Sequence, residues 1–316
     1  MAIDSETARF LVAASKSGVS FSKMLMLGRQ NYILRPAETK ALFSSFGITP
    51  DASLLKQNSD GSWPFSERFF GCLGAQQCDS MDVAAYEGAT VLHDLNEPID
   101  RPLAEKYDVV FDGGTLEHVF NFPQGLHNAM QMVKRGGWYV GFTPGNNYFG
   151  HGFYQFSPEL YYRALSPEYG FASCAVFMVP EGFGLSWFYV SDPARLHKRT
   201  NLINNLRTPL LVIAQKTGST PAKLRIQQSD YGAFWDKSQT ALNTGKTRSE
   251  SSLGRRLKEK LYAMAPGFTR RLATFDARSW HPEYAITRKE FYVPVPGDKL
   301  SEAISRYTSQ IATTNR

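Results

Sequence analysis

Two histidines and three aspartates stand where the side chains of this chain can gather around one ligand. His118 and His151 each come after an apolar, strand-like run, and Asp82, Asp94 and Asp112 stand at or just after the ends of such runs. A carboxylate at the carboxyl end of a strand can accept hydrogen bonds from both hydroxyls of a ribose. Histidine is the natural base near neutral pH. Each aspartate alone also fits a local turn, so the inference depends on their order along the chain.

Short apolar runs alternate with helical stretches, and these elements would position the five residues. The expected strands are 24–27, 77–82, 90–93, 107–111, 137–143, 174–179 and 209–215. The expected helices are 5–17, 36–46, 64–73, 123–133 and 158–164, four of which begin with proline. Proline is favoured at the first position of a helix because its missing N–H is not needed there. The alternation predicts an α/β fold, with a parallel sheet covered by helices.

Composition indicates a globular protein with a sizeable core. The chain has 316 residues, 42% of them hydrophobic, and no apolar run long enough to cross a membrane. Acidic residues stand near the N-terminus, where a signal peptide would carry basic ones. The three cysteines are too few and too scattered for a disulfide framework or a zinc site. We therefore expect a cytoplasmic protein with reduced thiols.

Charge is distributed unevenly between the two ends of the chain. Residues 1–194 contain 13 Lys and Arg against 20 Asp and Glu, a net charge of −7, whereas residues 195–316 contain 22 against 9, a net charge of +13. A basic region of this kind attracts phosphates, acidic glycans or lipid headgroups. A solvated basic face without a dedicated partner fits the same counts.

The most informative stretch is "YDVVFDGGTLEHVFNFPQGLHNAMQMVKRGGWYVGFTP", residues 107–144. An acid opens a buried strand, the strand ends in the small-residue turn of Asp112, Gly113 and Gly114, and "LEHV" starts the next element. A helix that begins with proline then ends at "VKRGG", where the glycines stop it before another strand. The stretch resembles the fourth and fifth strands of class I S-adenosylmethionine-dependent methyltransferases.

The resemblance spans roughly residues 20–218 and implies a fold and a cofactor. It implies a Rossmann-like, seven-stranded, mostly parallel sheet with an antiparallel last strand, "TPLLVIAQKT", and helices on both faces. The implied cofactor is S-adenosylmethionine. The implied domain is 1–218, with an insertion near 47–63, followed by a basic C-terminal extension at 219–316.

The resemblance also assigns cofactor-binding residues. Asp82 would hold the ribose hydroxyls, while Asp94 and the backbone at Leu95 would meet the adenine amino group. Asp112 and Gly113 form the turn beside the cofactor.

The loop after the first predicted strand departs from the family pattern. "MLMLGRQNY" keeps Gly28 but lacks the further glycines that let the backbone approach the methionine part of the cofactor. Two interpretations remain open. The loop is a working variant in which Arg29 or Gln30 holds the cofactor's carboxylate, or it no longer binds the cofactor.

His151 and His118 are the candidate catalytic residues. His151 lies in "NNYFGHGFYQF", whose aromatic residues include the candidate substrate-binding side chains Tyr148, Phe153 and Tyr154. His151 is either a base or a residue of a mobile lid, and His118 is either catalytic or a hydrogen-bonding residue at a helix start. Glu117 is expected to cap the following helix. Asp112, Glu117 and His118 could in principle hold a metal, but their spacing does not demand one, so we expect none.

The function predicted from these observations is methyl transfer from S-adenosylmethionine to an oxygen of a polar acceptor, such as a glycan or glycolipid. The glycan part depends on charge, on aromatic residues and on a loose similarity of "GHGFYQFSPEL" to methyltransferases of bacterial surface-polysaccharide pathways. The alternative is an inactive module of the same fold that binds an anionic partner.

A nucleic-acid partner is not favoured, since "DGGT" stands where an amino-methylating enzyme often has an Asn/Asp-Pro-Pro-aromatic tetrapeptide. The basic amphipathic pattern at 253–264 fits either packing onto the main domain or binding to a membrane surface. The sequence leaves the oligomeric state open.

Overall fold

The computed structural model describes residues 2–56, 62–181, 186–231 and 285–309. The chain divides into two compact units. Of the described residues, the first unit contains those within 2–190, 206–226 and 293–309, and the second contains those within 191–205, 227–231 and 285–292. In the second unit, Asp192 caps the short helix α6 (Pro193–Leu196), and Arg199 forms an ion pair with Asp230. All other elements below belong to the first unit, except that β11 begins at the last residue of the second.

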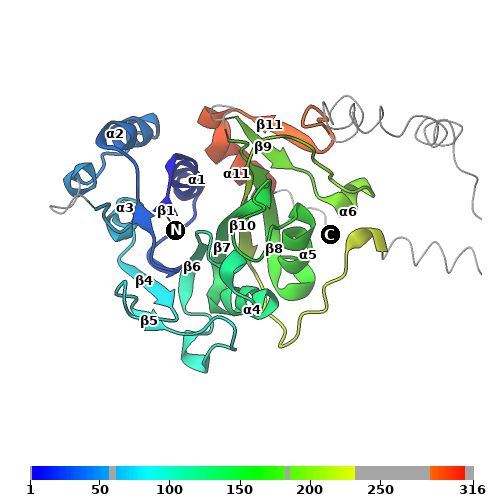
Figure 1. Ribbon diagram of the computed structural model, residues 1–316, viewed down its shortest axis with the longest axis horizontal. Coiled ribbons are helices and arrows are strands. Elements are labelled where there is room, and N and C mark those ends of the chain that lie inside the picture. The colour runs from blue at the N-terminus through cyan, green and yellow to red at the C-terminus, as the bar shows by residue number, and fades with distance from the viewer. Residues whose placement is uncertain (1, 57–61, 182–185, 232–284, 310–316) are drawn as a thin grey trace, which may run out of the picture. The chain divides into compact units, whose positions relative to one another are not determined.

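A nine-stranded sheet forms the centre of the first unit. Its strand order is β11-β9-β8-β10-β7-β6-β2-β4-β5 (Figure 1). The strand bounds are β2 Lys23–Leu27, β4 Gln77–Asp82, β5 Val91–Leu92, β6 Tyr107–Asp112, β7 Val133–Asn146, β8 Phe171–Met178, β9 Trp187–Val190, β10 Thr208–Lys216 and β11 Tyr292–Val295.

The predicted count of seven strands is wrong, because β9 and β11 extend the sheet beyond β8. All seven predicted runs do form strands. The two additional strands have only four residues each, which is too short for a clear periodic signal. In β11, Pro294 also argues against a strand. The sheet tolerates it because β11 is an edge strand, where a missing N–H leaves no neighbour unpaired.

Strand directions agree with the expectation of a mostly parallel sheet. β2 pairs in parallel with β4 and β6, β4 with β5, and β6 with β7. β10 runs antiparallel to both β7 and β8, as the resemblance implies for the last strand. β8 and β9 also pair antiparallel.

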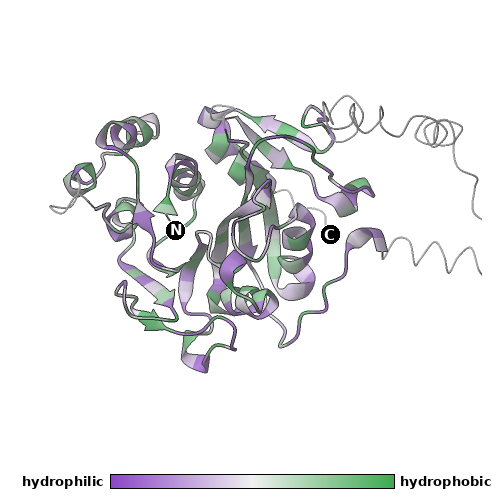
Figure 2. Cartoon of the chain, viewed as in Figure 1, coloured by the Kyte–Doolittle hydropathy of each residue, from purple (hydrophilic) through white to green (hydrophobic). Residues whose placement is uncertain are grey.

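Both faces of the central strands are buried. Met24 and Met26 of β2 belong to a large apolar cluster on one face. The alternate residues Leu25 and Leu27 are also buried but lie outside that cluster. Because successive side chains of a strand point to opposite faces, the sheet is covered on both sides. Figure 2 shows the hydrophobic colour concentrated in the central strands, while the surrounding helices carry both colours.

Helices α1 and α11, from the two ends of the chain, share one face of the sheet. Helices α4 and α5, from the middle of the chain, pack against strands β6, β7 and β8. α1 and α11 contact each other, and α11 also contacts β8 and β10. α4 contacts β6 and β7, and α5 contacts β8 (Figure 1). The helix bounds are α1 Ser5–Lys16, α2 Pro36–Ser45, α3 Glu67–Cys72, α4 Phe122–Met132, α5 Pro158–Ala164 and α11 Leu300–Ser309. The five predicted helices are thus confirmed.

The chain continues differently after β2 than a simple strand-to-helix turn would. Residues Asn31–Tyr32 form β3, which pairs in parallel with β1 (Ala2–Ile3). Helix α2 begins only at Pro36, where the N–H of Arg35 donates to the Glu38 carboxylate. In the described part of the predicted insertion near 47–63, residues Ala52–Leu55 form a short 3₁₀ helix.

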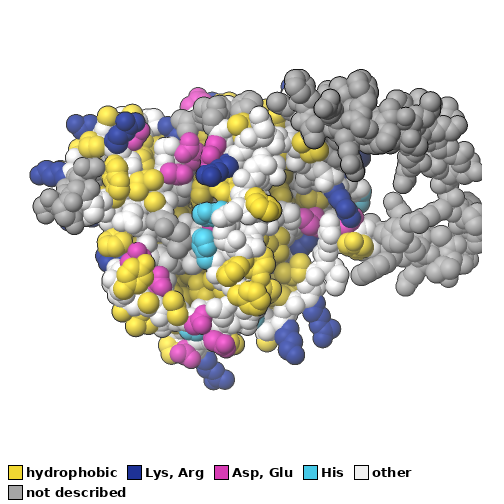
Figure 3. Space-filling view, in the orientation of Figure 1, with side chains coloured by type: hydrophobic (Ala, Val, Ile, Leu, Met, Phe, Trp, Pro, Cys, Tyr) yellow, Lys and Arg dark blue, Asp and Glu magenta, His cyan; other side chains and the backbone are white. Residues whose placement is uncertain are grey.

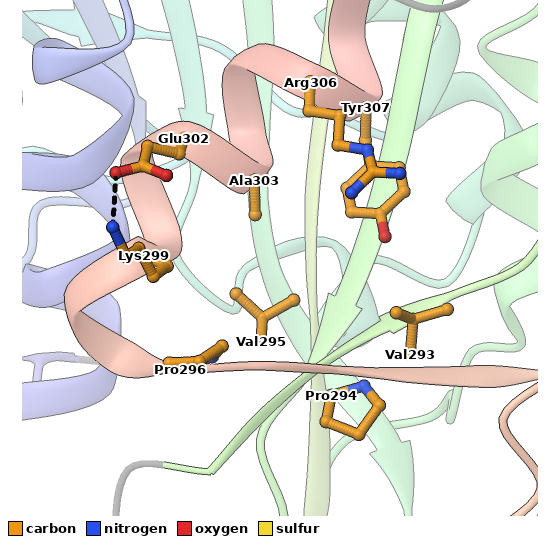
Figure 4. Close-up of a pocket in the computed structure, with 9 residues that line it drawn as sticks. All are labelled: Val293, Pro294, Val295, Pro296, Lys299, Glu302, Ala303, Arg306 and Tyr307. Atoms are coloured by element: carbon orange, nitrogen blue, oxygen red, sulfur yellow. Dashed lines mark hydrogen bonds and ion pairs between the residues drawn. The ribbon is translucent and has the colours of Figure 1, made fainter.

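Part of the predicted C-terminal extension belongs to the first unit. β11 joins the sheet and α11 packs against it. A cavity of about 180 Å³ lies between these two elements (Figure 4). The basic pattern at 253–264 lies outside the described residues, and the domain limits at 218 and 219 remain predictions. No helix among the described residues has the length and apolar character needed to span a bilayer.

Candidate functional site

The carboxyl ends of β2, β4 and β6 meet at one edge of the sheet. Leu27 of β2 stands opposite Met81 on one side and Asp112 on the other. The chain runs from β2 outward to β4 and β5, then returns to place β6 on the opposite side of β2. This reversal of strand order is where open α/β sheets bind their ligands. The predicted cofactor residues stand at this edge: Gly28, Arg29, Gln30, Asp82, Asp94, Leu95, Asp112 and Gly113.

Gly28 turns the chain sharply at the end of β2. Its φ of 68° lies in the left-handed region, which side chains with a Cβ rarely adopt. Its N–H donates to the carbonyl oxygen of Met81 at 2.8 Å, which ties the turn to the end of β4. A single glycine therefore suffices to make this turn.

Arg29 bridges three neighbouring segments. Its Nε donates to Glu67 at 2.6 Å, and another guanidinium nitrogen donates to the carbonyl oxygen of Glu87 at 2.6 Å. The guanidinium also lies 3.8 Å from the ring centre of Phe65. A cavity of about 310 Å³ beside it is lined by Arg29, Pro64, Phe65, Glu67 and Arg68. The positive charge of Arg29 is thus held in a fixed position next to the Gly28 turn.

Gln30 is fully buried and braces the turn from inside. Its amide nitrogen donates to the carbonyl oxygen of Leu27 at 3.2 Å, which also accepts a 2.5 Å bond from the hydroxyl of Thr115. A Cβ built at Gly113 would lie 2.9 Å from the Gln30 side chain. Glycine at 113 is therefore what lets the β6 turn pack against the β2 turn.

Asp82 and Asp94 are the accessible carboxylates of the site. Asp82 ends β4, and one of its oxygens accepts from the N–H of Ala84 at 3.2 Å. Asp94 is exposed and accepts from both the N–H and the side-chain amide of Asn96. These two hydrogen bonds stabilise the charged form and hold the pKa of the Asp94 carboxyl below its usual range. Leu95 is buried.

The loop after Asp94 is held by hydrogen bonds to two asparagines, Asn128 of α4 and Asn121, which directly precedes α4. Asn128 is fully buried and donates to the carbonyl oxygens of Leu95 and Glu97. Its side-chain oxygen accepts from the N–H of Ile99 at 3.2 Å. The side-chain oxygen of Asn96 accepts from the N–H of Asn121, and the carbonyl oxygen of Asn96 accepts from the side-chain amide of Asn121. Sequence reasoning missed Asn128, because an asparagine within a helix gives no sign of being buried.

Asp112 and Glu117 are buried carboxylates at the end of β6. Asp112 accepts from the N–H groups of Thr115 and Leu116 and, at 3.3 Å, from the hydroxyl of Tyr139. Burial raises the pKa of the Asp112 carboxyl. Burial and the nearby charge of Asp112 raise the pKa of the Glu117 carboxyl. Two negative charges in a buried region disfavour each other's ionisation.

Glu117 brings the two predicted catalytic histidines together. Its Oε1 lies 3.3 Å from Nε2 of His151 and 3.9 Å from Nε2 of His118. The two imidazole rings are 5.2 Å apart, and each histidine side chain is about half exposed, at 46% and 51%. Burial and the neighbouring His151 lower the pKa of the His118 imidazole.

The expected role of Glu117 as a helix cap is wrong. The N-cap residue of α4 is Asn121, and the Glu117 side chain points to the histidines instead. The motif "LEH" placed an acid beside a histidine, but its burial could not be read from the sequence.

Aromatic side chains surround the histidines. The ring centres of Tyr148 and His151 are 5.8 Å apart, and the Tyr148 hydroxyl donates a hydrogen bond to the Glu181 carboxylate. Phe153 is 66% exposed and packs edge-on against Phe120, while the Tyr154 hydroxyl donates to the carbonyl oxygen of Phe120. Figure 3 shows neighbouring histidine side chains at the viewed surface with hydrophobic side chains beside them.

The loop that carries His151 is fixed to the loop that carries His118. The N–H of Phe153 donates to the carbonyl oxygen of Glu117 at 2.8 Å, and a Cβ at Gly152 would lie 2.8 Å from that same oxygen. The cavity between β11 and α11 lies six strands away from β2 in the sheet order and contributes nothing to this arrangement.

Comparison with known proteins yields structural similarities only. No family model matches the chain, and no curated protein matches it. A SAM-dependent methyltransferase from Thermotoga maritima shares 13% identity over 66% of this chain and 89% of its own, with a TM-score of 0.33. The branched-chain polyamine synthase from Thermus thermophilus shares 13% identity over 71% of this chain and 59% of its own, with a TM-score of 0.35.

A third solved structure, the trans-methyltransferase CalH in complex with SAH, shares 14% identity over 67% of this chain and 57% of its own, with a TM-score of 0.34. Similarities at these scores establish neither the fold nor the activity of this chain.

Proposed function

We propose that the protein is an S-adenosylmethionine-dependent methyltransferase that methylates an oxygen of a polar acceptor. The observation that carries the proposal is the convergence of the Gly28 turn, Asp82 and Asp94 at the edge where the strand order reverses, directly beside the Glu117 and histidine cluster. Such a reaction requires one part of the site to bind the nucleoside of the cofactor and another part to position the acceptor.

The residues at this edge fit the cofactor. Asp82 has a carboxylate with capacity for both ribose hydroxyls, since its only described hydrogen bond is to Ala84. Asp94 and Leu95 stand where the adenine would lie, on a loop already fixed by Asn128. Gly28 carries no side chain where the backbone would approach the cofactor. Arg29 would reach the carboxylate of the cofactor's methionine part only by exchanging its bond to Glu67, and the buried Gln30 supports the turn.

Bound there, the cofactor would supply an activated methyl group on its sulfonium, and the chain's residues would orient the acceptor. His118 and His151 would face the reacting hydroxyl, because both lie at the carboxyl ends of strands and are half exposed. The loop around Tyr148, Phe153 and Tyr154 would hold the body of the acceptor, and the sulfonium is attracted to aromatic faces.

A glycan or glycolipid is the acceptor class that these features favour. Sugar rings present one polar edge and one apolar face, and the exposed rings of Phe120, Phe149 and Phe153 suit the apolar face. The net charge of +13 in residues 195–316 favours an anionic acceptor or an anionic surface nearby.

The proposal is tested by calorimetric titration of the chain with S-adenosylmethionine and S-adenosylhomocysteine. We expect micromolar binding of both, weakened in Asp82→Asn and unchanged in Asp298→Asn. Asp298 is an exposed aspartate at the other end of the sheet. Transfer of a labelled methyl group to a panel of polysaccharides and lipid-linked sugars then identifies the acceptor. Absence of cofactor binding in the wild type would reject the proposal.

One observation favours a second function. The β2 turn has a single glycine and continues into an extended segment, so a module that has lost the cofactor and binds an anionic partner through its basic C-terminal part fits the same turn. The titration distinguishes the two, because the inactive module binds neither cofactor form.

A further inference from the structure

Glu117, His118 and His151 form a ligand set that the proposed reaction does not itself require. One oxygen and one nitrogen from each imidazole all lie within 4.8 Å of one another. Two atoms bound to the same tetrahedral zinc ion are roughly 3.3 Å apart, given bond lengths of about 2.0–2.2 Å. Glu117 Oε1 and His151 Nε2 are 3.3 Å apart, and Glu117 Oε1 and His118 Nε2 are 3.9 Å apart. The ligand nitrogens of the two imidazoles lie within 4.8 Å of each other, and movement of these half-exposed rings would bring them to the spacing of a shared metal ion.

Among the described residues, one oxygen of the buried Glu117 carboxylate has no hydrogen-bond donor, while the other oxygen faces the two histidines. The Glu117 side chain is 1% exposed, and within the described part of the chain its Oε2 has no hydrogen-bond partner. A buried carboxylate with too few donors costs several kcal/mol when it is ionised, and a bound cation would compensate that charge. The two imidazoles bring nitrogen ligands to this oxygen.

Glycines keep the space around the carboxylate open. A Cβ at Gly114 would lie 3.0 Å from Glu117 Oε1, and a Cβ at Gly152 would lie 3.0 Å from Glu117 Cγ. Both glycines also have positive φ, of 93° and 72°. The two loops that carry the histidines therefore approach Glu117 closely without filling the region beside its oxygen.

We infer that Glu117, His118 and His151 bind one divalent transition-metal ion, such as zinc. Imidazole and carboxylate together suit zinc and its first-row neighbours better than magnesium or calcium, which prefer oxygen ligands. Three protein ligands leave a coordination position open, as in catalytic zinc sites. This site departs from the sequence-based expectation of no metal. If the chain binds no such ion, the 3.3 Å contact between His151 and Glu117 is a simple hydrogen bond.

The ion's role in the reaction depends on the proposed function. The ion would bind the acceptor's hydroxyl oxygen and lower the pKa of that hydroxyl. The hydroxyl proton would then pass to solvent, which reaches the half-exposed histidines. The acceptor oxygen then forms a bond to the methyl carbon while the carbon–sulfur bond breaks. The electron pair of that bond stays on sulfur, which yields S-adenosylhomocysteine.

Cobalt(II) titration of the untagged, chelator-treated chain tests the site directly, because Co²⁺ bound by nitrogen and oxygen ligands absorbs visible light. We expect one Co²⁺ per chain, displaced by Zn²⁺ and not by Mg²⁺. His118→Ala and His151→Ala should each weaken Co²⁺ binding at least tenfold. Both histidines are half exposed, so these variants should fold, and Glu117→Gln should lose binding as well if circular dichroism shows it folded.

The matched control is His197→Asn. His197 is an exposed histidine of the second unit with a φ of 51°, which asparagine tolerates. Its Co²⁺ binding should equal that of the wild type. Absence of stoichiometric binding in the wild type, or equal binding in His151→Ala, would overturn the metal site.

The readout separates the metal site from the proposed function. Co²⁺ binding without any S-adenosylmethionine binding would support the site and reject the methyltransferase. Methyl transfer by a chain that takes up no added Co²⁺ would support the enzyme and reject the metal site.

Discussion

At the carboxyl ends of β4 and β5, the carboxylates of Asp82 and Asp94 are accessible and bonded to nearby N–H groups, whereas at the end of β6 the carboxylates of Asp112 and Glu117 are buried. The first pair is ready for a neutral, hydroxyl-bearing ligand at little cost. In the second pair, burial raises the pKa values of both carboxyls, which favours their neutral forms. The same side chain thus has different acidity on the two sides, and burial causes the difference.

Loss of His151 should have the largest effect, because it lies on the buried-carboxylate side where the reaction would occur. We expect His151→Ala to lower the turnover of methyl transfer about 100-fold or more, while the dissociation constant of S-adenosylmethionine changes little. Steady-state kinetics and calorimetry measure the two quantities separately. His197→Asn should change neither, and equal losses in turnover and cofactor affinity in His151→Ala would contradict the separation of the two sides.

Asp82→Asn probes the accessible side. The substitution keeps the shape but removes the charge that strengthens hydrogen bonds to ribose hydroxyls. We expect a loss of about 1.5–3 kcal/mol in cofactor binding, which is roughly 10- to 150-fold. Turnover at saturating cofactor should fall much less. An unchanged dissociation constant in calorimetry would remove Asp82 from the cofactor site.

Gly113→Ala tests the contact between the two turns. The added Cβ would lie 2.9 Å from both the Gln30 side chain and the Phe111 ring, so we expect a loss of about 1–3 kcal/mol in the free energy of unfolding. Urea denaturation measures it.

Gly71→Ala is the control for this substitution, because a Cβ at this position in α3 meets nothing within 4 Å. It should be neutral or stabilising by up to about 1 kcal/mol. The double variant Gly113→Ala with Gln30→Ala should recover part of the loss, and full additivity would show that the contact with Gln30 is unimportant.

Asn96→Ala should have the smallest effect. The variant keeps the backbone N–H bond to Asp94 and loses only the side-chain bonds to Asp94 and Asn121. We expect cofactor affinity to fall by about 0.5–1.5 kcal/mol, measured by the same titration. Asn201→Ala, at an exposed position of the second unit, should leave the affinity as it is. A loss as large as that of Asp82→Asn would mean that the loop, not the carboxylate, dominates binding.

The sequence predicted the elements of the sheet well and the site only in part. Strands such as β2 and β6 are apolar on both faces, and that pattern survives in the sequence. The short edge strands β9 and β11 carry no such pattern. β11 and α11 come from the C-terminal hundred residues, yet they join the sheet and the α1 face, which only long-range contacts reveal.

Within the site, positions were predictable and environments were not. Gly28, Asp82 and His118 follow strands, so topology places them at the edge. That Glu117 is buried, and that His151 reaches it across 34 positions of chain, depends on how the Gly152 loop packs onto the end of β6. The sequence also suggested that Arg29 or Gln30 holds the cofactor's carboxylate, and it gave no sign that Arg29 bonds to Glu67 or that Gln30 is buried.

The aromatic side chains of the loop that carries His151, here called the aromatic rim (Tyr148, Phe149, Phe153 and Tyr154), have a practical consequence for protein engineering. The backbone under this rim is anchored by its own hydrogen bonds, from Phe153 to Glu117 and from Tyr148 to Gln155. The rings of Phe149 and Phe153 instead extend largely into solvent. Their side chains can therefore be exchanged in libraries at small cost to folding, and under the proposed function such libraries would test whether these rings select the acceptor.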